Sequence, residues 1–435
     1  MKIVKRIIKY LLLGIGGLLG LLLIILFTPG IWHHWVTYPS YEKEVNELAK
    51  LRKEPTAQIN LNTYRGVMHV HSYLSHDSRG TLDDLIPAAK KDGIDFIFLT
   101  DHPHGNIDTL PKGFRGFHDG VLIEPGTEKQ GFCAWPLKPA IIQWNADRDT
   151  IAKKIVSSGG IVFYAHSEEP HNWVNPDYQG MEIYNFHTDT KDQSPVPILF
   201  DVLVNGGAYR HWVLRQFFDP QTPILAHWDS LNNTRKIVGF SAIDAHENQN
   251  LRARYLPDGR VQWVGNNAHN LDTMEVKFWN KWLFSAPDKS GWVFKLLVDT
   301  YQTGFNYITN YVMSDSLTTS SLGKNMKQGH LFIAFKSLGD AKGFQFYGTN
   351  SKDSITGILG DSIKIDQLKN LKASSPLPGQ FTLVHNGKTI NTSTANAYQF
   401  SFSEPIEKGT YRIEMSLNLQ GKLIPWVYTN PIYIY

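Results

Sequence analysis

The chain has 435 residues, of which 42% are hydrophobic and 19% are charged, and this composition excludes a disordered or fibrous protein. Its one cysteine, Cys133, excludes a disulfide framework and a zinc ribbon built from thiolates. The formal net charge is +3, and four basic residues lie within the first nine positions. The rest of the chain is therefore close to neutral and lacks the excess of basic residues that a nucleic-acid-binding face requires. A chain of this length predicts two or three domains.

An apolar segment follows the basic N-terminus. Residues 11–27 contain no charged or polar side chain, and residues 10–32 together are long enough to cross a bilayer core of about 30 Å. The basic residues before this segment favour a cytoplasmic N-terminus. No small-residue cleavage site follows it, so we favour an uncleaved anchor over a signal peptide. We expect a single-pass membrane protein with residues 1–9 in the cytoplasm, a transmembrane helix at 10–32, and the remainder outside the cytoplasm.

The central part of the chain alternates between strand and helix patterns. Helices are predicted at 82–91, capped by Thr81 and closed by Gly93, and at 149–158, which ends at two glycines. Short apolar runs typical of strands lie between them. These runs are 66–71, 95–102, 120–123, 161–166, 181–185 and 237–244. Such alternation over residues 64–316 predicts an α/β fold, either a parallel barrel or a doubly wound sheet.

The regions on either side of this part have different patterns. Residues 33–63 are predicted to form a connector that contains a short helix capped by Ser40. Residues 317–435 contain short alternating strands and an Asn386-Gly387 pair, which is a strong hairpin signal. We therefore expect a C-terminal all-β sandwich.

Metal-ligating side chains gather where the predicted strands end. The spacing of two residues in His69-x-His71 and Asp244-x-His246 points both side chains of each pair to one side of a strand. The carboxyl ends of the strands of a parallel barrel open onto one face, so all of these side chains would meet there. The expected ligands are His69, His71, His76, His102, Glu128, His166, Asp244 and His246. Imidazole with carboxylate suits Zn, Mn or Fe, and eight donors indicate two or three divalent ions.

The motifs occur in a specific order. They are His69-x-His71, Ser75-His76, Thr100-Asp101-His102, Gly126-x-Glu128, Ala165-His166 and Asp244-x-His246. Together they resemble the PHP (polymerase and histidinol phosphatase) domain over residues 64–316. The resemblance implies a distorted (β/α)7 TIM-like barrel whose metal cluster hydrolyses phosphoesters. The C-terminal region, with Gly329–Ile333 and Trp426-x-x-x-Asn430-Pro431, is similar to a β-sandwich that some members of that family append.

The resemblance also implies how the ligands divide between ions. Two ions would be held by His69, His71, Glu128, His166 and Asp244, and a third by His76, His102 and His246. Many members of the family carry an aspartate where this chain has His76.

Several other residues lie near these motifs. His104 and His171 each follow a ligand motif and could donate a proton to a leaving oxygen, grip phosphate, or be ordinary loop residues. Asp101 is expected to fix the tautomer of a ligand histidine. Glu182 could support a ligand or be structural, and Cys133 has no basic neighbour and is expected to be inert.

These patterns lead to one main hypothesis. The protein is expected to be a membrane-anchored phosphoesterase that acts outside the cytoplasm on a phosphate monoester or diester by means of a metal-bound hydroxide. Its substrate would be a phosphorylated small molecule, lipid or wall polymer. Two alternatives stay open: a metal-stabilised module that binds a surface glycan or protein, and an amidohydrolase-like metallohydrolase.

Overall fold

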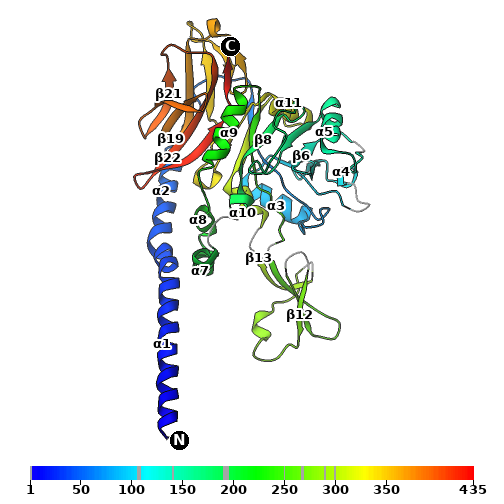
Figure 1. The fold of residues 1–435 in the computed structure, drawn as a ribbon, viewed down its shortest axis with the longest axis vertical. Helices are drawn as coiled ribbons and strands as arrows, with labels where there is room; N and C mark the ends of the chain where they lie inside the picture. Colours follow the sequence, from blue (N-terminus) through cyan, green and yellow to red (C-terminus); the bar gives the residue numbers. More distant parts are fainter. Residues whose placement is uncertain are drawn as a thin grey trace.

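The computed structural model describes residues 2–104, 109–139, 142–189, 195–248, 250–265, 269–288, 291–297 and 300–435. It consists of a long N-terminal helix, a mixed α/β body, and a small sheet that extends from the body on the side of that helix (Figure 1). The C-terminal strands lie at the end of the body farthest from the N-terminus. The expectation of a mixed α/β fold is confirmed.

The N-terminal helix is longer than predicted. Helix α1 spans Lys2–Trp32, continues through a π-helical turn at His33–Thr37, and runs into α2 at Tyr38–Lys50. The predicted separate helix capped by Ser40 is therefore wrong, because Thr37, the residue before α2, keeps helical backbone angles. Among the described residues, this is the one helix whose length and apolar composition would allow it to cross a membrane.

The end of α1 packs against helix α7, which spans Pro195–Asn205. The rings of Phe27 and Phe200 meet edge to face with centroids 4.9 Å apart. The Asn205 side chain donates a hydrogen bond of 2.8 Å to the carbonyl of Gly30. A Cβ atom at Gly30 would lie 3.3 Å from Val204, so glycine permits the close approach of the two helices. The body is thereby attached to the end of the apolar helix.

Every predicted strand of the central region is present, in most cases shortened at its carboxyl end. The six strands are β1 (Asn62–Met68), β2 (Phe96–Phe98), β4 (Val121–Glu124), β7 (Ile161–Tyr164), β8 (Gly180–Asn185) and β9 (Val238–Ala242). They form two parallel triplets, β1-β2-β4 and β7-β8-β9. A hairpin of β5 (Thr127–Lys129) and β6 (Phe132–Trp135) adds antiparallel strands beside β7.

Two contacts join the triplets. At the end of β1, Val70 forms a parallel bridge with Ala245, and the Asp244 amide donates to the His69 carbonyl over 2.7 Å. Beyond the end of β2, the Glu128 amide donates to the Thr100 carbonyl over 3.0 Å. These bonds bring the strand ends of both triplets to one place.

The predicted helices of this region are also confirmed. Helix α3 spans Leu82–Asp92, with a capping box at Thr81 and a left-handed Gly93 (φ 61°) after its last turn. Helix α5 spans Arg148–Ser157, and the Asp147 side chain accepts hydrogen bonds from its first amides. The remaining helices of this region are α4 (Thr109–Lys112), α6 (Phe186–Asp189), α8 (Arg210–Arg215), α9 (Thr222–Asn232) and α10 (Tyr301–Tyr307).

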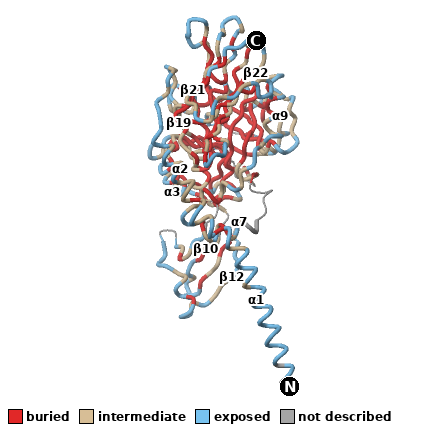
Figure 2. Tube along the Cα trace, turned by 90° about the vertical axis from the view of Figure 1, so that its left-hand side faces the viewer, coloured by how far each residue is buried: buried red, intermediate tan, exposed pale blue. Residues whose placement is uncertain are grey.

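The small sheet is an insertion that the sequence analysis missed. Its antiparallel strands are β10 (Asn250–Tyr255), β11 (Val261–Val264), β12 (Asn270–Met274) and β13 (Trp292–Leu297). It has a small core of its own around Ala253, Val261 and Val293. Apart from this core, much of the insertion is exposed, whereas the interior of the body is buried (Figure 2).

The C-terminal region is not all-β. Helix α11 (Thr319–Gln328) lies within it, because Thr318 caps the helix and left-handed Gly329 ends it. The predicted hairpin is confirmed: Asn386 and Gly387 both have positive φ and join β19 (Asn370–His385) to β20 (Lys388–Thr392). The other strands here are β15 (Leu331–Ala334), β16 (Gln345–Thr349), β17 (Ile355–Ile358), β18 (Ser362–Ile363), β21 (Ala397–Phe402), β22 (Gly409–Leu419), β23 (Lys422–Thr429) and β24 (Ile432–Ile434). Through β14 (Thr309–Ser314), they share one continuous sheet with β1.

A buried ion pair joins helix α9 to strand β22. The Arg412 guanidinium donates to both carboxylate oxygens of Asp229, over 2.7 and 2.8 Å, and both side chains are about 95% buried. Burial lowers the pKa of Arg412, but Asp229 and Glu414 outweigh it and hold the pKa above its ordinary value. The guanidinium therefore stays charged inside the protein.

We predict that Asp229→Ala lowers the free energy of unfolding by about 3 kcal/mol or more, because it leaves the Arg412 charge buried without this partner. Denaturant unfolding of the detergent-solubilised chain, followed by tryptophan fluorescence, measures the change. Asp258→Ala is the matched control, since Asp258 pairs with Arg260 at the surface. Equal unfolding midpoints for the two variants would contradict the role of the buried pair.

Candidate metal centre

Three of the expected ligands have an unusual backbone conformation. His69, His166 and Asp244 have φ angles of 58°, 49° and 54°, in the left-handed region that non-glycine residues rarely adopt. His69 directly follows the last residue of β1, and His166 and Asp244 each come second after the last residue of β7 and of β9. Such a conformation costs about 1–3 kcal/mol per residue and is concentrated at functional sites. The backbone at these strand ends is therefore strained where it presents the candidate ligands.

Five imidazoles are oriented through their Nδ1 atoms. In three of them Nδ1 lies next to a side chain: Glu182 for His69 (2.5 Å), Ser75 for His71 (3.4 Å) and Thr188 for His166 (3.4 Å). In the other two it lies next to a backbone carbonyl: that of Glu128 for His102 (3.0 Å) and that of Asp244 for His246 (2.9 Å). A carbonyl only accepts, so Nδ1 of His102 and of His246 carries the proton. This leaves Nε2 as the ligand atom, an arrangement common among metal-binding histidines.

The Nε2 atoms of these imidazoles converge on three carboxylates. Glu128 lies within 2.8–3.5 Å of His69, His71, His102 and His166. Asp244 lies 3.3 Å from His69 and 3.4 Å from His71. Asp77 lies 3.4 Å from His102 and 3.3 Å from His246. Two groups of four donors result: one of His69, His71, Glu128 and Asp244, and one of His71, Asp77, His102 and His246.

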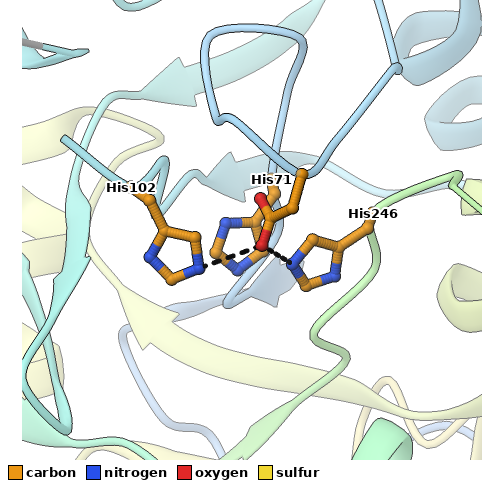
Figure 3. A group of neighbouring side chains, drawn as sticks. His71, His102 and His246 are labelled. Atoms are coloured by element: carbon orange, nitrogen blue, oxygen red, sulfur yellow. Dashed lines mark ion pairs between the residues drawn. The ribbon is translucent and has the colours of Figure 1, made fainter. Parts of the chain in front are cut away.

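The second group contains Asp77 and not the expected His76. Figure 3 shows the rings of His71, His102 and His246 around one carboxylate, which belongs to Asp77. The His76 side chain is 58% exposed, and its Nε2 atom lies 4.0 Å from Asp77. The turn after β1 thus directs the residue after His76 inward. Asp77 therefore replaces His76 in the candidate ligand set.

The charges in this cluster favour the ionised forms of both partners. Burial raises the pKa of Asp77, but hydrogen bonds from His102 and His246 lower it well below its usual range. Burial also raises the pKa of Glu128, and the charge of His69 with a hydrogen bond from His166 lowers it well below its usual value. Conversely, hydrogen bonds to Glu128 and Glu168 overcome the effect of burial and raise the pKa of His166 to about 11. When no metal ion is bound, the proton on His166 therefore supplies positive charge next to the Glu128 carboxylate.

The residues fit divalent metal ions. His71 Nε2 and Asp244 Oδ1 are buried atoms with no hydrogen-bond partner among the described residues, and they lie 3.4 Å apart. Leaving such groups unpaired is costly, whereas a cation between them would satisfy both. The clusters of His, Asp and Glu could therefore bind metal ions, as the sequence predicts.

Glu182 and Cys133 lie on the outer side of His69 and form a third group with it. Glu182 holds Nδ1 of His69 and also accepts a hydrogen bond of 2.9 Å from the His166 amide. It therefore orients two candidate ligands at once. Burial raises the pKa of the Cys133 thiol to about 12, so the thiol stays protonated and is a poor metal ligand.

Asp101 does not contact a histidine through a hydrogen bond, contrary to expectation. Its carboxylate accepts from the amide and the hydroxyl of Ser72, over 2.5 and 2.9 Å. Asp101 therefore stabilises the turn that follows β1. Because Ser72 is the residue after His71, these bonds fix the backbone that carries this candidate ligand.

The two other histidines lie in different surroundings. His104 Nε2 donates to the carbonyl of Leu74 over 3.2 Å, and its ring lies 5.6 Å from that of His76. His171 Nε2 donates to the carbonyl of His166 over 3.0 Å, and its ring packs against Tyr164 at 4.7 Å. Burial lowers the pKa of His171, so its ring is neutral near pH 7. His104 therefore lies beside exposed His76, whereas His171 lies behind a ligand.

The expected ligand set left out four residues that lie around the site. Asp77 follows His76 directly, so the motif contained it, but only the turn decides which side chain points inward. Glu168 and Thr188 lie beside the His166 ring, at 3.6 and 3.4 Å, and the ring of His187 lies 6.1 Å from that of His246. Glu168 lies two residues after the Ala165-His166 motif. Thr188 and His187 lie outside every ligand motif, so the sequence gave no signal for them.

No family model matches the chain, and no curated protein matches it. Among solved structures, it is similar to the crystal structure of a two-domain protein from Bacteroides vulgatus containing a predicted PHP-like metal-dependent phosphoesterase. The similarity covers 88% of this chain and 99% of that chain, with 12% sequence identity and a TM-score of 0.35. At this level of similarity, the function has to be inferred from the site itself.

We predict that Asp77→Ala lowers the number of ions bound per chain, whereas His76→Ala leaves it unchanged, because only Asp77 reaches His102 and His246. Elemental analysis after equilibration with Mn²⁺ or Zn²⁺ gives the ion content of each variant. Loss of an ion from His76→Ala with retention in Asp77→Ala would reverse the assignment.

Metal binding is also expected to release protons. The pKa of His166 is raised to about 11, so this ring is protonated near pH 7 and must lose a proton to bind a cation. Carboxylate neighbours also raise the pKa of His102 and of His246, in the same direction. Affinity then falls as pH falls, by about tenfold per pH unit for each displaced proton. Calorimetric titration with Zn²⁺ in two buffers of different ionisation enthalpy measures the release, and equal heats in both would refute it.

Proposed function

We propose that the protein is a metal-dependent phosphoesterase. The observation that carries this proposal is the convergence of five imidazole Nε2 atoms on the carboxylates of Asp77, Glu128 and Asp244. Seven of these eight donors form two adjacent groups of four, which share His71. The eighth, His166, places its Nε2 atom 3.2 Å from Glu128 of the first group. Two adjacent ions suit phosphoryl chemistry because they can clamp a phosphate between them.

The ions would be held by His69, His71, His166, Glu128 and Asp244 on one side, and by Asp77, His102 and His246 on the other. When bound there, divalent ions offset the charge of a phosphate and make a bound water acidic enough to react near neutral pH. The protein supplies rigid placement: strained strand ends and the bonds at each Nδ1 fix the donors before substrate arrives.

Residues at the rim are assigned different roles. His104 has Nε2 committed to the carbonyl of Leu74, so Nδ1 is the atom that could give or take a proton at the entrance. His76 lies beside it and is exposed, which suits contact with an anionic substrate. We assign His171 a positioning role, since it donates to the carbonyl of His166 from behind. The lowered pKa of Glu168, caused by His166 against the effect of burial, keeps it ionised, so it is an acceptor and not an acid.

The finer statements about architecture belong to the same proposal. We interpret the two parallel triplets with the β5-β6 hairpin as a distorted TIM-like barrel within residues 64–316, and residues 317–435 as an appended β-rich domain. The apolar helix would cross a membrane once, with residues 1–9 in the cytoplasm and the metal centre outside. Substrates would then be phosphate monoesters or diesters outside the cytoplasm, free or attached to lipids or wall polymers.

We predict that the full chain in detergent hydrolyses a chromogenic phosphate ester when Mn²⁺ or Zn²⁺ is added. Asp244→Asn should lower kcat/KM by more than about 100-fold, since it removes the charge of a carboxylate shared by His69 and His71. Parallel assays with a monoester and the matching diester would define the substrate class.

Asp366→Asn is the matched control. Asp366 is an exposed residue of the C-terminal region, and it lies far along the sequence from the strand ends that carry the candidate ligands. Its turnover should equal that of the unaltered protein. Turnover that survives in Asp244→Asn would exclude this cluster as the source of the activity.

A further inference from the structure

An exposed aromatic group lies between β12 and β13 of the inserted sheet. The side chains of Phe278, Trp279 and Trp282 are 89%, 57% and 78% exposed, and we call this group the aromatic tip. The rings of Phe278 and Trp279 meet edge to face with centroids 5.0 Å apart. None of the three belongs to the core of the sheet, which is formed by other residues. Their packing within the described chain therefore does not account for their apolar surface.

The composition around the tip is typical of a membrane interface. Lys277 and Lys281 flank the aromatic residues and are exposed. Lys277 lies over the Trp279 ring at 5.3 Å and pairs with Glu275 at 3.2 Å. Tryptophan is enriched at the headgroup level of bilayers, and lysine can place its apolar stem there with its charge in water.

The inserted sheet lies on the side of the body to which α1 extends. In both views it extends from the body in the direction of α1 (Figures 1 and 2). Helix α7 lies on the same side and is bonded to the end of α1. Two of its apolar side chains, Leu199 and Leu203, are 54% and 63% exposed. Three segments with exposed apolar side chains thus lie on one side of the body: the long helix, α7 and the inserted sheet with its aromatic tip.

We propose that the aromatic tip docks into the headgroup region of the bilayer that holds α1. This inference rests on the proposed membrane location of the chain. The exposed charges of Asp258, Arg260 and Asp272 keep the rest of the sheet out of the hydrocarbon, so only the tip inserts. The membrane contact then involves two places, the apolar helix with α7 and the tip.

A bilayer explains this surface better than a protein partner. Three side chains present far less area than the roughly 1,200–2,000 Å² that stable protein interfaces bury. A chain attached to the bilayer through α1 keeps lipid permanently close to any apolar group on this side, so even a weak contact is populated.

The docking also concerns the metal centre. Strand β10 begins at Asn250, soon after His246, and β13 leads to α10, whose Tyr301 donates a hydrogen bond of 2.5 Å to the carbonyl of His71. The sheet is therefore attached to the rim of the candidate site. Docking of its tip would hold that rim near the membrane surface, where phosphorylated lipids present their headgroups.

The experiment uses the full chain in vesicles of phosphatidylcholine and phosphatidylglycerol. Cys133 is buried, so a cysteine introduced at the surface can be labelled selectively with an environment-sensitive fluorophore. Phe278→Cys tests the tip, and Trp282→Cys repeats the test at a second exposed position. Leu18→Cys reports on the centre of the apolar helix, and exposed Lys388→Cys, in the C-terminal hairpin, is the control. Quenchers are nitroxides placed high or low on the lipid chain, and aqueous iodide.

We expect the labels at Phe278 and Trp282 to be quenched most by the shallow nitroxide, the label at Leu18 by the deep nitroxide, and the label at Lys388 by iodide alone. Quenching of Leu18 by lipid while Phe278 and Trp282 respond only to iodide would overturn the docking and leave the anchor intact. Protection of the tip from both lipid nitroxides and iodide would indicate a protein partner and also overturn it. If Leu18 is not quenched by lipid, the membrane location fails and the docking with it; hydrolysis assays are independent of all these outcomes.

Discussion

The contact between the ends of β1 and β9 is the constraint on which the candidate site depends. There the Asp244 amide donates to the His69 carbonyl over 2.7 Å, and Val70 pairs with Ala245. Both His69 and Asp244 take left-handed backbone angles at this point, so their side chains turn toward the same space. Two residues further along each segment, the rings of His71 and His246 stack with centroids 4.1 Å apart. Two strands thus bring four of the donors together.

The cluster links metal binding to folding stability. Without ions, the pKa of His166 is raised to about 11, which places a proton between this imidazole and the largely buried Glu128 carboxylate. An ion that binds only the folded chain adds about 4 kcal/mol of stability when its free concentration is about 1,000 times Kd. That gain can offset the strain of three left-handed residues, at about 1–3 kcal/mol each. Metal binding and the strained strand ends are therefore parts of one energetic balance.

The features that the sequence predicted well depend on short stretches of chain. The capping box at Thr81, the turn at Asn386-Gly387 and the apolar strands each have a local cause, and the structure contains them. His76 and Asp77 show where local reasoning ends, because both can bind metal and only the path of the turn decides between them. The inserted sheet was missed for a related reason: its small core gives a weak pattern within a region dominated by strands and helices of the body.

The position of the insertion has a mechanical consequence. A body attached to a membrane through one helix can rotate about that attachment, and the entrance to the metal centre would then face the lipid only part of the time. The proposed contact of the aromatic tip, at a distance from α1, would remove much of this freedom. Because the inserted sheet leaves the body between β9 and α10, the strand end that carries Asp244 and the helix that contacts His71 are both directly connected to it. The orientation of the sheet and the orientation of the site are therefore coupled.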